Sequence, residues 1–104
     1  MRVLVNSDNS VNIPSELAGE IAEAIEKAMR LFADDITRVE VHLGDVNAER
    51  GGAADKRCML EARLAGLKPI AVDHHASTLQ QAFSGALAKL QRNLQSTQGK
   101  LRGR

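Results

Sequence analysis

The apolar residues of this chain recur with two different periods, and this change of period is what most limits the folds open to it. Across residues 17–32 and again across residues 79–94 they recur at three- and four-residue steps, as on one face of an α-helix. Between these segments, residues 36–43 and 57–64 alternate apolar and polar side chains, which is typical of strands with one buried face. The chain therefore combines two amphipathic helices with half-buried strands.

Short segments complete the expected sheet. Residues 2–5 read as a strand, and residues 66–68 form a tight hairpin turn that leads into another strand at residues 69–73. Pro69 lacks a backbone N–H, so it favours the start of a strand or a sheet edge. Residues 44–55 are interpreted as a loop.

The helix ends are marked by residues suited to them. Pro14 fits the first helical position, and the acidic pair at residues 34–35 ends the first helix. Thr78 is expected to cap the second helix while the Gln81 side chain reaches back to it, as in a capping box. Gly99 is the expected stop of that helix.

These elements predict the order β-α-β-β-β-α. Two helices that pack on one face of a four-stranded, mainly antiparallel sheet would bury both kinds of apolar pattern, which makes the fold class α+β, a two-layer sandwich. A chain of 104 residues is expected to hold a single domain, here residues 1–98, followed by a short basic tail at residues 99–104.

Charge is divided unevenly along the chain. All thirteen acidic residues lie at or before Asp73, so residues 1–73 sum to −4 and residues 74–104 to +5. The five cations after Asp73 are Lys89, Arg92, Lys100, Arg102 and Arg104. A cationic C-terminal segment predicts a polyanionic partner, most commonly nucleic acid bound through its phosphates.

Lys89 and Arg92 lie three residues apart on the outward face of the second helix, and both side chains are expected to point to solvent. Their neighbours on that face are uncharged amides and hydroxyls, so no carboxylate competes with a phosphate for the cations. An ordinary solvated helix face, with cations favoured near the helix C-terminus, explains the same pattern equally well.

The outward face of the expected sheet carries charges of both signs. Such mixtures more often form cross-strand pairs than binding sites, and we favour pairing here by about two to one. Lys56, Arg57 and Arg63 nevertheless extend the candidate basic surface.

Several functional classes are disfavoured. No apolar run is long enough to span a bilayer, and the single cysteine, Cys58, fits a reducing cytoplasm. The chain has two aromatic residues, so base stacking is a poor means of RNA recognition for it, and reading of backbone and shape is favoured. No cofactor and no small-molecule substrate are expected, and the protein is expected to be a cytoplasmic monomer.

The run Asp73-His74-His75 is the strongest candidate for a metal or catalytic site. Adjacent residues on a strand point to opposite faces, so the two imidazoles are poorly placed to ligate one ion. Cys58 is expected to be buried without a cation to activate it. No metal site and no enzymatic activity are therefore predicted.

The segment from Thr78 to Leu94 resembles the closing helix of the ribosome hibernation-promoting factors and ribosome-associated inhibitor A proteins, formerly called sigma-54 modulation proteins. Lys89-Leu90-Gln91-Arg92-Asn93-Leu94 is similar to the Lys-Leu-x-Arg-Gln-Leu element of that family. The element order is also the family's, and it is similar to that of double-stranded-RNA-binding domains. The likeness extends over nearly the whole chain.

The resemblance implies a bacterial or plastid stress protein that binds the rRNA of the small ribosomal subunit in the mRNA and tRNA channel and blocks translation sterically. It implies that Lys89 and Arg92 contact rRNA phosphates. The alternative is a regulatory module of the same fold that binds a protein and not the ribosome.

Overall fold

The computed structural model describes residues 1–8, 11–46 and 55–102, with the backbone alone for residues 98–102. Strands and helices follow one another in the expected order β-α-β-β-β-α, with one turn of 3-10 helix (η1) after the first α-helix. Their bounds are β1 Arg2–Ser7, α1 Ser15–Ala28, η1 Arg30–Phe32, β2 Ile36–Asp45, β3 Lys56–Leu64, β4 Ile70–Ala76 and α2 Leu79–Arg102.

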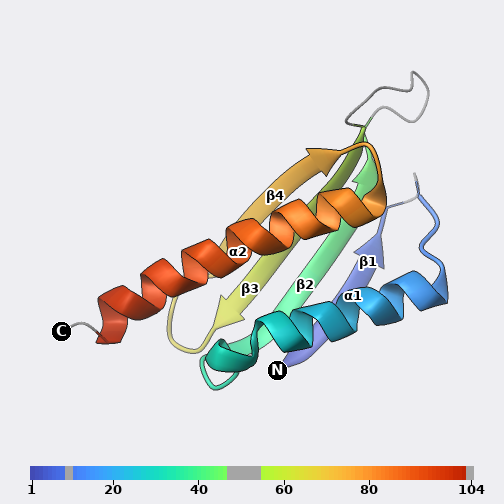
Figure 1. Cartoon of the computed structure of the whole chain (residues 1–104). Coiled ribbons are helices and arrows are strands. Elements are labelled where there is room, and N and C mark those ends of the chain that lie inside the picture. The colour runs from blue at the N-terminus through green and yellow to red at the C-terminus, as the bar shows by residue number, and fades with distance from the viewer. Residues whose placement is uncertain (9–10, 47–54, 103–104) are drawn as a thin grey trace.

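The strands form one sheet in the order β1-β2-β3-β4, and both helices lie on the same face of it (Figure 1). β1 pairs with β2 in parallel because α1 carries the chain back across the sheet between them. β2, β3 and β4 pair antiparallel. The predicted two-layer α+β fold with a mainly antiparallel sheet is therefore confirmed, and no element of the described chain covers the other face of the sheet.

The core lies between the sheet and the helices. The alternating positions predicted to point inward are all buried in β2 and β3. From the helices, the predicted stripes supply the opposing layer, with Ile21 and Ile25 of α1 and Leu90 and Leu94 of α2 almost inaccessible to solvent. Both aromatic residues, Phe32 and Phe83, are also buried in this core.

Two boundaries differ from those expected. The first α-helix ends at Ala28, before the acidic pair, and the chain tightens into η1 so that Phe32 still reaches the core. β2 continues to Asp45, two residues into the expected loop, and the backbone N–H of Val46 donates to the carbonyl of Asp55 at 2.8 Å. Residues 47–54 of that loop lie outside the described part of the chain.

The β3–β4 hairpin follows the predicted turn. Gly66 has a φ of +73°, a left-handed conformation that suits glycine and few other residues. Pro69 directly precedes β4, which is an edge strand of the sheet. This position agrees with the prediction, because proline has no backbone N–H to donate to a neighbouring strand.

The N-terminus of α2 is capped as predicted by Thr78, whose hydroxyl accepts a hydrogen bond from the Gln81 backbone N–H at 3.1 Å. The Gln81 side chain, however, accepts from the Ser77 hydroxyl at 2.8 Å, one residue before the expected partner. At the other end, the helical backbone passes Gly99, the expected stop, and reaches Arg102. The helix thus crosses the predicted boundary between domain and tail.

Candidate nucleic-acid interface

The two long flanks of α2 differ in chemistry. The flank that faces α1 presents the uncharged Gln80 and Ser84, which line a groove between the helices. The opposite flank carries Lys89 and Arg92, which line a hollow together with Val72 and Asp73 of the edge strand β4. α2 packs across this strand (Figure 1). The described cations of α2 are therefore concentrated along one side of the molecule.

An open hollow lies where that flank meets β4. Its volume is about 460 Å³, and it is lined by Val72 and Asp73 from β4 and by Lys89, Arg92 and Asn93 from α2.

 The hollow joins two long cations and an amide beside a strand edge, a combination that suits a phosphate group.

Lys89 does not point freely to solvent, which corrects the expectation from the sequence. Its Nζ donates a hydrogen bond of 2.8 Å to the backbone carbonyl of Asp73, and its side chain is half-buried. The reason is the position of α2, which crosses the sheet so that this flank meets β4. Lys89 therefore helps to seat α2 as well as lining the hollow.

Arg92 is exposed, and no hydrogen bond or ion pair holds it within the described part of the chain. Asn93 beside it is exposed as well. Among the predicted cations whose side chains the structure describes, Arg92 is the one that remains available to an external anion without giving up a partner.

Arg57 and Lys56 of β3 are both held by carboxylates. Arg57 Nε lies 3.1 Å from Asp73 Oδ2. Lys56 Nζ lies 3.0 Å from Asp45 Oδ2 and 3.3 Å from Asp55 Oδ1. The hydrogen bond to Asp45 raises the pKa of Lys56 above its ordinary value, despite the opposing effect of burial.

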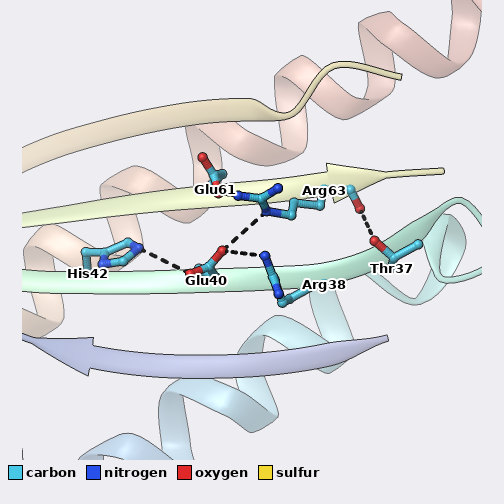
Figure 2. Close-up of polar contacts among 6 residues, drawn as sticks. All are labelled: Thr37, Arg38, Glu40, His42, Glu61 and Arg63. Atoms are coloured by element: carbon cyan, nitrogen blue, oxygen red, sulfur yellow. Dashed lines mark hydrogen bonds and ion pairs between the residues drawn. The ribbon is translucent and has the colours of Figure 1, made fainter. Parts of the chain in front are cut away.

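A network of charges occupies the uncovered face of the sheet (Figure 2). At its centre, Glu40 Oε2 lies 3.1 Å from Arg38 Nη2 and 3.4 Å from Arg63 Nε, and Glu40 Oε1 lies 3.8 Å from His42 Nε2. Burial opposes the ionisation of Glu40, but the attraction of Arg38 and Arg63 outweighs it and lowers the pKa of the carboxyl.

Arg63 has a second carboxylate partner in this network. Its Nη2 lies 3.2 Å from Glu61 Oε1, and its backbone carbonyl accepts a hydrogen bond from the Thr37 hydroxyl at 3.1 Å (Figure 2). The pairing predicted for the mixed charges of the sheet is present. Arg63 is thus committed within the protein and is a weaker candidate for RNA contact than Arg92.

The side chains of the remaining predicted cations lie outside the described part of the structure. Lys100 and Arg102 belong to the helical backbone of α2, but their side chains are outside the described set, and Arg104 lies outside the described residues altogether. Their part in binding stays a prediction.

The histidine pair is divided between the two faces of β4, as predicted. The ring of His74 packs under α2, so closely that a Cβ on Gly85 would overlap it, while His75 is exposed and pairs in register with Arg57. Burial raises the pKa of the Cys58 thiol to about 12, so the thiol is protonated at neutral pH. Within the described residues, no group of His, Cys, Asp or Glu is arranged to hold a metal ion.

The sequence pattern suggests only metal or catalytic chemistry for Asp73, yet in the structure Asp73 contacts Arg57 and Lys89. A signal for this was available in the hairpin. Met59 pairs with Asp73, and Arg57 with His75, in a register symmetric about Gly66. Counting outward from the predicted turn would have placed Asp73 diagonally opposite Arg57.

No helix in the described part of the chain is long and apolar enough to cross a membrane.

Comparison with known proteins points to one family. A family model described as "Sigma 54 modulation protein / S30EA ribosomal protein" matches residues 4–102. A ribosomal subunit interface protein from Coxiella burnetii has a similar structure, with a TM-score of 0.72 and 17% sequence identity, over 95% of this chain and 99% of that one. The N-terminal domain of Protein Y from Thermus thermophilus is also similar, with a TM-score of 0.68 and 14% identity, over 92% of this chain and 94% of that one. No curated protein matches the sequence.

Proposed function

The chain belongs to the sigma 54 modulation protein / S30EA ribosomal protein family, and we propose that it acts as a ribosome-associated translation inhibitor. The family consists of non-enzymatic, ribosome-associated proteins. The finer proposal is that the chain binds rRNA of the small subunit in the mRNA and tRNA channel. Occupying that channel blocks translation sterically, under stress or in stationary phase.

The observation that carries this proposal is the hollow at the edge of α2 and β4. It brings Lys89, Arg92 and Asn93 together, and Arg92 has no carboxylate partner within the described residues. Phe32 and Phe83 are buried, so neither offers a platform for base stacking. Recognition is therefore proposed to run through phosphates and the shape of the RNA backbone.

A test is co-sedimentation of the purified protein with whole ribosomes and with separated subunits, at low and moderate salt. Arg92→Gln removes one exposed cation from the hollow, and Lys27→Gln removes one exposed cation from α1 as a control with the same change in net charge. We expect salt-sensitive pelleting with the small subunit that is weakened several-fold by Arg92→Gln and hardly at all by Lys27→Gln. Absence of the wild-type protein from every ribosomal fraction at low salt would contradict the proposal.

The second candidate is a regulatory module that binds a protein. The network around Glu40 favours it, because a sheet face with paired charges of both signs suits a partner of mixed charge better than a polyanion. Binding of that kind would survive Arg92→Gln and respond to Glu40→Gln.

A further inference from the structure

Asp73 occupies a position where three of the predicted cations meet. Its Oδ2 lies 3.1 Å from Arg57 Nε, and its backbone carbonyl accepts the hydrogen bond of Lys89. It also lines the same hollow as Arg92. Asp73 is the last acidic residue of the chain, so no later carboxylate shares this position.

We propose that the Asp73 carboxylate is an internal competitor of RNA phosphate: it holds Arg57 in the free protein and yields it to a phosphate when RNA binds. This inference rests on the proposed function and assigns a regulatory residue to the same surface. By keeping one cation occupied, Asp73 limits the affinity for RNA in general and reserves full binding for RNA that places a phosphate within reach of Arg57.

The Arg57–Asp73 ion pair is exposed and can be broken at little cost in free energy. The side chains are 42% and 47% exposed, and a single nitrogen–oxygen contact joins them. An exposed pair of this kind contributes little to stability and exchanges readily with an external anion. Arg63 differs, because Glu40 and Glu61 both hold it.

The edge position of β4 allows one ligand to reach both sides of the strand. Asp73 and Arg57 alternate along their strands with His74, which packs under α2, and with the buried Cys58, so they belong to the uncovered face of the sheet. Lys89 and Arg92 belong to α2, which lies on the other face (Figure 1). No further strand lies beyond β4 in the described sheet, so an RNA backbone along this edge can contact cations of both layers.

The test compares Asp73→Asn with Glu61→Gln. Both remove one negative charge from the uncovered face, but Asp73→Asn frees Arg57, whereas Glu61→Gln leaves Arg63 held by Glu40. Asn at position 73 keeps the backbone carbonyl that accepts from Lys89, and thermal unfolding checks that both variants remain folded. Binding is measured with isolated small subunits and with a short double-stranded RNA across a series of salt concentrations.

We expect Asp73→Asn to raise affinity for both probes several-fold more than Glu61→Gln does. The slope of log affinity against log salt should become more negative by about 0.7 to 0.9, the contribution of one additional phosphate contact. In an Arg57→Gln background, Asp73→Asn should lose this excess, because the cation that it frees is gone.

The outcomes separate this inference from the proposed function. Equal effects of Asp73→Asn and Glu61→Gln, with wild-type binding intact, would overturn the inference alone. Wild-type binding to the double-stranded RNA but not to small subunits, with a larger gain from Asp73→Asn than from Glu61→Gln, would overturn the proposed function and support the inference. Failure of both proteins to bind either probe would overturn both.

Discussion

Lys89 and Arg92 stand three residues apart on α2, yet their surroundings differ. Lys89 is tied to β4 through the Asp73 carbonyl, and Arg92 is exposed. A substitution at position 89 therefore changes the packing of α2 as well as the charge of the hollow. A loss of RNA binding in a Lys89 variant would need a stability measurement before it could be assigned to a phosphate contact.

Lys89→Glu is expected to lower the free energy of unfolding by about 1 to 3 kcal/mol, because a donor to a partly buried carbonyl is replaced by a repelled carboxylate. Arg92→Glu is expected to change it by less than about 0.5 kcal/mol, as for an exposed residue without partners. Urea unfolding of the two variants checks this. Equal stability of both variants would show that the Lys89 hydrogen bond contributes nothing.

Cys58 is expected to resist alkylation by iodoacetamide in the folded protein at pH 8. Its thiol is buried, and a pKa of about 12 leaves almost no thiolate at that pH. Protein unfolded in urea should react at the rate of an ordinary cysteine. Rapid modification of the folded protein would contradict the position of Cys58 in the core.

At the scale of elements, the close packing of α2 on β4 depends on a glycine. Gly85 lies over the ring of His74, where a Cβ would overlap the imidazole. Gly19 of α1, by contrast, has open space around the position of a Cβ. The two helices thus contain a glycine required by packing and one that packing does not require.

Gly85→Ala is expected to destabilise the protein by about 1 to 3 kcal/mol, because the overlap with His74 outweighs the better helix propensity of alanine. Gly19→Ala is expected to stabilise it by up to about 1 kcal/mol. Chemical denaturation of both variants measures the difference. Adding His74→Ala to Gly85→Ala should recover part of the loss, and a strictly additive double variant would argue against the close contact.

At the scale of the whole molecule, Arg92 on one side is available, whereas Arg38, Arg57 and Arg63 of the sheet are paired with carboxylates. The α2 flank over β4 presents Arg92, whereas on the uncovered face Glu40, Glu61 and Asp73 neutralise these three arginines. The molecule is therefore polarised more strongly than its net charge of +1 suggests.

Binding to small subunits is expected to weaken with salt with a log–log slope of roughly −2 to −4, corresponding to about three to five phosphate contacts. A salt series of the co-sedimentation assay measures the slope. A nearly flat dependence would favour the protein-binding alternative, since a partner of mixed charge releases few counterions.

The sequence predicts many of the side chains of the candidate site, but not which of them are already paired within the protein. Arg92 on the outward face of the second helix followed from helical spacing, and pairing of the sheet charges followed from strand alternation. The attachment of Lys89 to the Asp73 carbonyl did not, because it depends on the angle and distance at which α2 crosses β4. Lys89 and Asp73 are distant in the sequence, so local periodicity does not predict their contact.

The sequence by itself determined which segments become helices and strands and which of their faces are buried, because a period of 3.6 or 2 residues is a property of the local backbone. Only the tertiary structure decided which cations remain available. Strand register brings Arg57 into an ion pair with Asp73. The packing of α2 brings Lys89 into contact with β4 and leaves Arg92 exposed. Ion pairing acts over a few ångströms between distant residues, so it is settled only when the layers come together.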